Sequence, residues 1–310
     1  MRRFDWLARI EQLDPAVDYE EIARITGTIE FPWDVNQALS FALFRTYAVP
    51  SIGRLLADTG EFTERVQKRY DDTALILDAV SEHGLGSAQG RDAVRRMNQM
   101  HGSYAISNGD MLYVLSTFVV TPIRWVDQFG WRKLVEKEKV AATNYYRELG
   151  RLMGMKDIPA TYQEFGAYLD AYEAEHFAFD AGARAVADST LQLFTTFPPN
   201  NYAPAALIKR FSYGLMDDPL RAAFRYPKLS KVEQAFSRRL VWLRGRFVRM
   251  LPPRREPKFA RQLPNVRSYP NGYDIPALGT FPRGCPVPHA EAPAPEPARQ
   301  EGVLPDVQRQ

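Results

Sequence analysis

One segment with helical periodicity carries a histidine on an otherwise apolar face. Val94, Met97, His101 and Tyr104 recur at intervals of three and four residues, so they fall on one side of a helix. The imidazole of His101 is therefore predicted to be buried among core side chains. A single buried histidine below an open position is the ligand set that a protein supplies to a haem iron. The alternative is a core histidine that is hydrogen-bonded to a backbone carbonyl.

A second helical segment places a cation and a hydroxyl on a similar face. Its stripe consists of Val66, Arg69, Thr73, Leu77 and Val80. Because an unpaired buried charge is costly, Arg69 requires an anion such as a haem propionate or a bound oxygen species. Thr73, one turn away, offers a hydrogen-bond donor to an oxygen ligand. The alternative is that Arg69 reaches the surface or pairs with Asp71 or Asp72.

The other histidines do not complete a metal site. His83 lies beside a glycine-rich loop and His289 in a proline-rich tail, where solvated side chains are expected. Glu173 and His176 have the spacing of half a di-iron carboxylate site, but the sequence contains no second Glu-x-x-His. No two histidines are four residues apart, as a helical zinc motif requires. His101 is therefore the candidate metal ligand.

Helices must position these residues, because strand-like alternation is scarce and helical periodicity recurs from about residue 18 to residue 251. Proline and glycine interrupt the helical hydrogen-bond ladder, and they predict roughly eight to eleven helices. The predicted boundaries are Pro32, Pro50, residues 84–90, Pro122, Gly130, Pro159, Pro198, Pro204 and Pro227. The predicted fold class is a single all-α domain that encloses a cofactor pocket.

Composition limits the function classes. A chain of 310 residues with 45% hydrophobic content can support one large domain with an interior pocket. A net charge of +3 does not indicate a nucleic-acid-binding protein. The single cysteine, Cys285, excludes an intramolecular disulfide and a cysteine-rich metal site. No apolar run of about 18 residues or signal-peptide pattern occurs, so we expect a soluble, cytoplasmic protein.

Proline distribution predicts the domain organisation. Residues 252–310 hold 13 of the 23 prolines, and such a segment cannot continue a helix. We predict a helical domain over residues 1–251, an extended strap over 252–289 and a disordered tail over 290–310.

A basic amphipathic segment precedes the strap. Its apolar stripe consists of Phe236, Leu240, Leu243, Phe247 and Met250. Residues 238–261 contain nine Lys and Arg residues and one acidic residue, Glu256. A helix of this kind, here near residues 236–251, can lie on an anionic membrane and help an enzyme to collect an apolar substrate. The favoured interpretation is a core helix with a solvated basic face.

The stretch from Phe31 to Tyr172 resembles the MpaB-type oxygenase and rubber oxygenase (latex clearing protein) catalytic-domain family, especially its MpaB-like branch. The matching phrases are FPWDVNQALSFALFRTYAVPSIGRLLADTGEF, KRYDDTALILDAVSEHG, RRMNQMHGSYAISNGDMLYVLSTFVVTPIRWVDQFGWR and ELGRLMGMKDIP. The resemblance implies a globin-reminiscent helical fold that holds a b-type haem, with His101 as axial ligand and Arg69 and Thr73 on the distal face. Rubber oxygenases carry a lysine directly before the distal threonine, where this chain has Asp72.

The residues and the resemblance together predict a haem-dependent oxygenase. It uses dioxygen to cleave or oxygenate a carbon–carbon double bond in an apolar, isoprenoid-like small molecule. A haem without a cysteine thiolate ligand lacks the electron donation to iron that supports hydroxylation of unactivated carbon. The favoured substrate is therefore an electron-rich alkene. Asp72 in place of lysine argues against long rubber polymer. Two alternatives remain open: a non-catalytic carrier of haem or an apolar ligand, and a peroxide-dependent haem enzyme.

Overall fold

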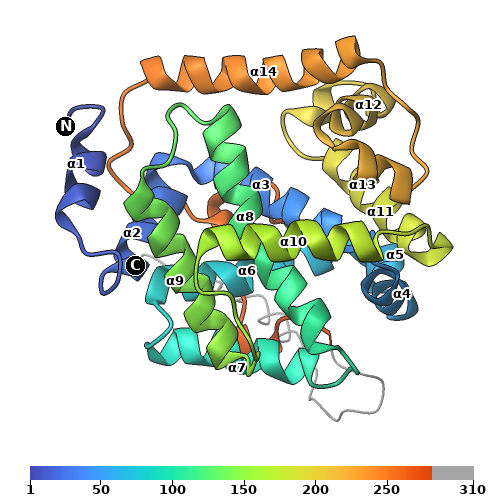
Figure 1. Cartoon of the computed structure of the whole chain (residues 1–310), viewed down its shortest axis with the longest axis horizontal. Helices are drawn as coiled ribbons and strands as arrows, with labels where there is room; N and C mark the ends of the chain where they lie inside the picture. Colours follow the sequence, from blue (N-terminus) through green and yellow to red (C-terminus); the bar gives the residue numbers. More distant parts are fainter. Residues whose placement is uncertain (281–310) are drawn as a thin grey trace, which may run out of the picture. The chain divides into compact units, whose positions relative to one another are not determined.

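The computed structural model confirms the all-α fold class. It describes residues 1–280, which contain fourteen α-helices and no strand (Figure 1). The helices are α1 (Asp5–Gln12), α2 (Tyr19–Arg24), α3 (Pro32–Thr46), α4 (Pro50–Asp58), α5 (Glu61–Glu64), α6 (Val66–His83), α7 (Ala88–His101), α8 (Asn108–Phe129), α9 (Glu136–Leu152), α10 (Tyr162–His176), α11 (Ala181–Thr195), α12 (Ala205–Leu215), α13 (Asp218–Ala223) and α14 (Lys231–Met250). A π-helical segment, η1 (Ile25–Glu30), and three 3₁₀ turns complete the list: η2 (Asn200–Tyr202), η3 (Ala260–Gln262) and η4 (Ile275–Ala277).

The number of helices exceeds the predicted eight to eleven, because several helices are too short to show periodicity. Helices α2, α5 and α13 have six, four and six residues. The predicted boundaries at Pro32 and Pro50 are confirmed, since each proline begins a helix. Proline suits this position because the first helical N–H has no intrahelical acceptor.

Helix α8 is the centre of the packing, and it contacts α3, α9, α10 and α14. Pro122 lies inside α8, so the predicted helix boundary at this residue is wrong. An interior proline costs about 3 kcal/mol. Beyond it, α8 buries Ile123, Val126 and Phe129, each of which contributes about 1.5–3 kcal/mol. This burial outweighs the local penalty and keeps the helix continuous.

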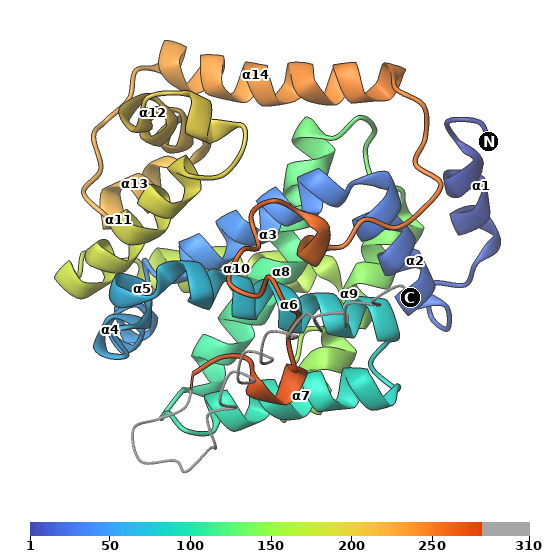
Figure 2. The ribbon, with the colours of Figure 1, turned by 180° about the vertical axis from the view of Figure 1, so that it is seen from behind.

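Helices α6 and α7 form a helical hairpin (Figure 2). Gly84 ends α6 with a φ of +81°, which a residue with a Cβ rarely adopts. The Ser87 side chain then caps α7 by accepting a hydrogen bond of 2.8 Å from the N–H of Gly90. Because the connection is short, the beginning of α6 lies beside the end of α7. Arg69 and His101 therefore sit at the same end of this pair.

The chain after α14, residues 251–280, is an irregular segment with two 3₁₀ turns, and we call it the strap. The rest of the strap predicted over residues 252–289 and the tail predicted over 290–310 lie outside the described residues. Two buried carboxylates of α6 hold the backbone of the strap. Asp71 accepts hydrogen bonds from the N–H groups of Arg267 and Ser268, at 3.0 and 2.8 Å. Asp78 accepts the N–H groups of residues 260 and 261, at 2.8 and 2.9 Å. These contacts satisfy backbone donors that an irregular segment cannot pair within itself.

Loss of one of these carboxylates should loosen the strap. Asp71→Ala leaves two strap N–H groups without their acceptor, which costs about 1–3 kcal/mol. We expect tryptic cleavage after Arg261 and Arg267 to become roughly tenfold faster. Asp92→Ala, which removes a more exposed carboxylate on α7, is the control and should leave the cleavage rate unchanged. Equal rates for the two variants would contradict the anchoring role.

Helix α14 contradicts the favoured interpretation of a core helix. Its predicted core stripe is exposed: 62% of the Phe236 surface, 55% of Phe247 and 76% of Met250 remain accessible. The helix lies across the outside of the other helices (Figures 1 and 2). It packs instead through a face of small residues that includes Ser237 and Gly245, because these permit close approach to α12 and α8.

A methyl group at Gly245 should disturb this contact. A Cβ there would lie 2.1 Å from the carbonyl oxygen of Phe129, a backbone atom that cannot rotate away. We expect Gly245→Ala to lower the free energy of unfolding by about 1–3 kcal/mol, measured by urea denaturation. Gly86→Ala is the control, because a Cβ at Gly86 meets open space. An unchanged stability for Gly245→Ala would contradict the close packing of α14.

Across residues 1–280, no helix has both the length and the apolar character to cross a bilayer.

Candidate functional site

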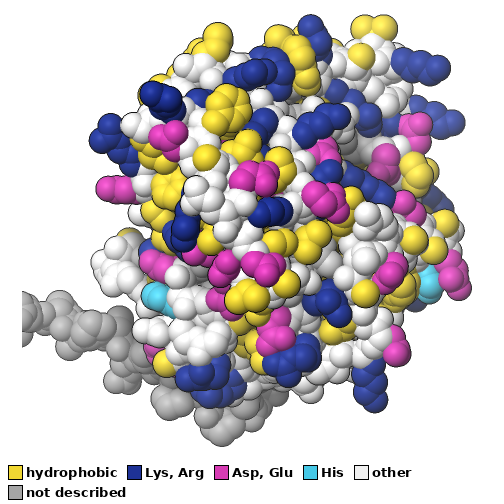
Figure 3. All heavy atoms as spheres, turned by 60° about the vertical axis from the view of Figure 1, so that its left-hand side comes forward, with side chains coloured by type: hydrophobic (Ala, Val, Ile, Leu, Met, Phe, Trp, Pro, Cys, Tyr) yellow, Lys and Arg dark blue, Asp and Glu magenta, His cyan; other side chains and the backbone are white. Residues whose placement is uncertain are grey.

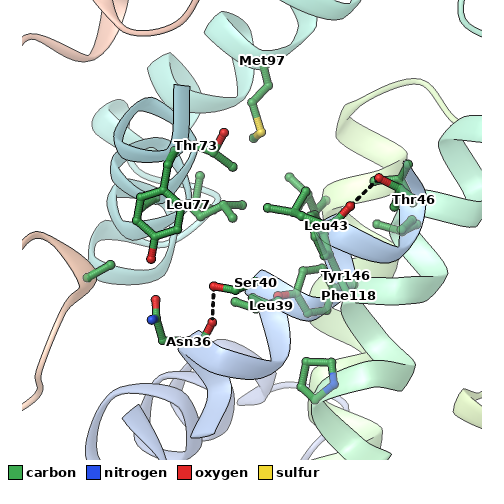
Figure 4. Close-up of a pocket in the computed structure, with 18 of the residues that line it drawn as sticks. Asn36, Leu39, Ser40, Leu43, Thr46, Thr73, Leu77, Met97, Phe118 and Tyr146 are labelled. Carbon is green, nitrogen blue, oxygen red and sulfur yellow. Dashed lines mark hydrogen bonds between the residues drawn. The ribbon is translucent and has the colours of Figure 1, made fainter. Parts of the chain in front are cut away.

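The helices enclose a cavity of about 640 Å³. Its walls come from α3, α6, α7, α8 and α9, and the strap contributes Lys258, Ala260 and Leu263. Figure 4 shows Thr73 and Met97 on one side, facing residues of α3, α8 and α9 on the other. Small-molecule sites in proteins have volumes of about 300–1,000 Å³ and mainly apolar walls with a few polar groups. The cavity has this size, and its lining is of this kind.

The predicted polar stripe of α6 faces this cavity. All five of its residues contribute to the wall: Val66, Arg69, Thr73, Leu77 and Val80. The Arg69 guanidinium donates a hydrogen bond of 2.5 Å to the Thr73 hydroxyl, which donates in turn to the Arg69 carbonyl oxygen at 3.0 Å. The guanidinium also lies 5.4 Å from the ring centre of Phe62. Thr73 and Phe62 therefore fix the position of a cation at the cavity wall.

His101, the last residue of α7, also lines the cavity. Its Nδ1 atom is buried and has no hydrogen-bond partner in residues 1–280, so the predicted alternative of a bond to a backbone carbonyl is not observed at this atom. Burial, and to a smaller extent the positive charge of Arg69, lowers the pKa of His101 to about 4. The imidazole is therefore neutral at pH 7, and a neutral imidazole is the form that binds metals.

Neither neighbouring aspartate pairs with Arg69. Asp71 holds the strap, and Asp72 accepts a hydrogen bond of 2.7 Å from Lys68 and another from the Tyr269 hydroxyl. In the part of the chain that the structure covers, Arg69 forms no ion pair with a carboxylate. The charge of Arg69 at the cavity wall thus has a hydroxyl and an aromatic ring, but no anion, as neighbours.

The remaining histidines lie away from this arrangement. His83 is 3.6 Å from a carboxylate oxygen of Glu82 at the end of α6. His176 stacks on the ring of Tyr172, with ring centres 4.0 Å apart. Glu173 binds Arg45 and is not available as a ligand. His289 falls outside the described residues, and among residues 1–280 no three His, Cys, Asp or Glu side chains gather as a metal cluster.

A second set of polar residues in the cavity wall was not predicted from the sequence. Asn36 and Ser40 of α3 line the wall, as does Tyr70 of α6, and the Ser40 hydroxyl donates a hydrogen bond of 2.9 Å to the Asn36 carbonyl oxygen. Figure 4 shows Asn36 and Ser40 on the same turn of α3. The sequence contains a signal for these residues, because Asn36 and Ser40 interrupt the apolar spacing of α3 in the way that Arg69 and Thr73 interrupt the apolar spacing of α6.

Two tyrosines of α9 were also missed. Tyr145 and Tyr146 both line the cavity, and burial raises the pKa of each phenol above its ordinary value. Both phenols therefore stay protonated and can act as hydrogen-bond donors. Nothing in the sequence distinguishes them from core aromatic residues, because their role depends on the cavity beside them.

Comparison with known proteins identifies the family of the chain. A family model described as the catalytic domain of ER-bound oxygenase mpaB/B' and rubber oxygenase matches residues 36–246. The chain belongs to this family. The matched region includes Arg69, Thr73 and His101 and confirms the resemblance predicted from the sequence phrases. Membership of the MpaB and rubber oxygenase family indicates that the protein is an enzyme of the oxygenase class.

Two relatives from Penicillium illustrate the similarity. The chain is 31% identical to ER-bound oxygenase mpaB of Penicillium roqueforti (strain FM164) over 224 residues, which cover 66% of this chain and 74% of that protein. It is also 31% identical to ER-bound oxygenase mpaB' of Penicillium brevicompactum over 252 residues, 76% of this chain. That match spans 59% of the Penicillium brevicompactum protein.

Proposed function

We propose that the protein is a haem-dependent oxygenase with His101 as the axial ligand of a b-type haem. The observation that carries the proposal is a neutral imidazole whose Nδ1 has no partner within residues 1–280, at the wall of a large and mainly apolar cavity. A haem needs as few as one such ligand from the protein, since the porphyrin itself supplies four nitrogen ligands to the iron. Family membership supports the oxygenase chemistry.

The charges around the cavity fit a haem as well. Among residues 1–280 no carboxylate pairs with the Arg69 cation, and a haem propionate would provide the anion. Thr73 keeps the guanidinium in place through a hydrogen bond of 2.5 Å. Donation by Thr73 to a ligand requires that its bond to the Arg69 carbonyl break, so we assign Thr73 first to positioning Arg69.

The protein also controls what reaches the reacting atoms. When bound, the haem supplies the dioxygen chemistry, which the side chains themselves do not provide. The apolar wall excludes water, which strengthens the interactions of Arg69 with a developing negative charge. The phenols of Tyr145 and Tyr146 remain neutral donors that orient a polar group of the substrate.

We infer that the substrate is an apolar small molecule with an electron-rich double bond, such as a short prenyl chain. The cavity volume of about 640 Å³ suits a small molecule. Asp72 is committed to Lys68 and Tyr269, and so offers no replacement for the lysine found at this position in rubber oxygenases. We therefore expect a small prenylated compound to be a better substrate than rubber polymer.

The location of the protein is also revised. The sequence predicts a cytoplasmic protein, whereas both fungal relatives carry the term ER-bound in their names. We infer that this protein works at a membrane surface, where apolar alkenes accumulate.

The purified protein tests this proposal. We expect a Soret band, a b-type pyridine haemochrome and close to one haem per chain. With heavy-isotope dioxygen and a panel of prenylated compounds, the label should appear in carbonyl or oxygenated products. A protein that stays colourless after expression with added haem would overturn the haem assignment.

Two other outcomes would support the alternatives. Reversible dioxygen binding by the reduced protein, without product from any compound in the panel, would favour a carrier of haem. Turnover that requires hydrogen peroxide and continues without dioxygen would favour a peroxide-dependent enzyme.

A further inference from the structure

The outer face of α14 carries a row of large apolar side chains that nothing in residues 1–280 covers. This row, the α14 stripe, consists of Val232, Phe236, Leu240, Leu243, Phe247 and Met250, all of them exposed. At a rise of about 1.5 Å per residue, it extends over roughly 27 Å. Isolated exposed apolar residues are ordinary, but a continuous row of this length indicates a contact surface.

The packing of α14 explains why the stripe points outward. Ser237, Val241 and Gly245 are buried, and they lie on the side of the helix opposite the stripe. A Cβ at Gly214 of α12 would meet Ser237 Oγ at 2.3 Å, and one at Gly245 would meet the Phe129 carbonyl oxygen at 2.1 Å. These close contacts fix the rotation of the helix about its axis, so the stripe cannot turn inward without breaking them.

Basic residues flank the stripe. The helix contains six basic residues and one acidic residue, Glu233, which is paired with Arg210. Lys231, Arg239 and Arg249 are exposed, and Arg239 borders the stripe by helical spacing. Arg244 and Arg246 are half-buried: Arg244 pairs with Asp34, and Arg246 donates hydrogen bonds to backbone carbonyl oxygens after α8. Figure 3 shows dark blue basic side chains next to yellow apolar ones at the upper end of the molecule. Two more exposed arginines, Arg254 and Arg255, follow the helix.

We propose that α14 docks the protein on an anionic membrane, with the α14 stripe in the interfacial region and the exposed basic residues at the lipid phosphates. An apolar face accompanied by exposed basic residues is the arrangement of helices that lie in a membrane interface. A second copy of the chain fits less well, because pairing two such helices would bring their arginines together without acidic partners. The excess of positive charge selects a negatively charged surface.

The strap connects α14 to the cavity. It begins directly after α14, and Lys258, eight residues beyond Met250, lines the cavity. The docking proposal itself does not depend on the proposed chemistry, because it concerns a separate surface.

Vesicle sedimentation of the full-length chain tests the proposal. We expect binding to vesicles of phosphatidylcholine mixed with phosphatidylserine, and at least tenfold weaker binding to phosphatidylcholine alone. Replacing two apolar residues, Leu243→Ser with Phe247→Ser, should weaken binding to the mixed vesicles by at least tenfold. Replacing two cations, Arg239→Gln with Arg249→Gln, should weaken it by roughly twentyfold, at about fivefold for each charge.

A matched control is available on another surface. Val17 is 74% exposed, and Val17→Ser should bind vesicles as the wild-type protein does. All variants should keep the wild-type melting temperature, because the changed side chains are exposed. Failure of the wild-type chain to bind either vesicle, or equal binding to both, would overturn the proposal. A dimer that becomes monomeric in the Leu243→Ser, Phe247→Ser variant, without vesicle binding, would show that the face joins two copies instead.

Discussion

His101→Ala should yield a protein that folds but retains little haem. Loss of a residue that only hydrogen-bonds to a metal ligand weakens metal binding by about tenfold to a hundredfold. Loss of the ligand itself should weaken haem binding at least as much. The absorption spectrum after gel filtration measures this effect directly, independently of activity. Circular dichroism should remain unchanged, since His101 is the last residue of α7 and its Nδ1 has no hydrogen bond within residues 1–280 to lose.

Two other histidines provide the controls. His83→Ala and His176→Ala remove an imidazole paired with Glu82 and one stacked on Tyr172, and neither of these contacts belongs to the cavity. Both variants should keep the Soret band of the wild-type protein. Full retention of haem by His101→Ala, or its loss from either control, would assign the ligand to another residue.

Arg69→Met should keep the haem but lower turnover by about a hundredfold. A positioned donor to a developing oxyanion contributes roughly this factor, because water is excluded and the donor is already oriented. Thr73→Val should cause a smaller decrease, up to about tenfold, since it removes a hydrogen bond that holds the guanidinium. Turnover per haem is the quantity to compare.

Lys68→Met is the matched control for Arg69→Met. It removes a cation from the adjacent position of α6, but this cation pairs with Asp72. Turnover per haem should change little in this variant. Equal decreases in the Arg69 and Lys68 variants would mean that the net charge of α6 matters, rather than a contact in the cavity.

Helical spacing in the sequence predicts which polar residues of α6 and α7 face the interior. Arg69 and Thr73 share a face of one helix, and His101 shares a face with Met97 on the next. The connection at Gly84 is short enough that these two faces must come together. Asn36 and Ser40 follow the same rule and could have been found from the spacing of α3.

Other features depend on contacts between distant residues, which spacing does not reveal. The apolar residues of α14 form a clear stripe in the sequence, but the choice of buried face follows from Gly245 against Phe129 and from Ser237 against Gly214. Pro122 continues a helix because the residues after it are buried. In both cases the tertiary contact, rather than local preference, decides the structure.

The position of the strap in the chain sets the order in which the cavity is completed. Asp78 and Arg261 are 183 residues apart in sequence, and Asp71 and Ser268 are 197 apart. Helix formation and the turn between α6 and α7 are local and fast, whereas closing loops of this length is slower. During synthesis the helical walls therefore emerge before the strap that covers them. A cofactor of the proposed kind would therefore meet a half-open cavity first, and the strap would be added around it.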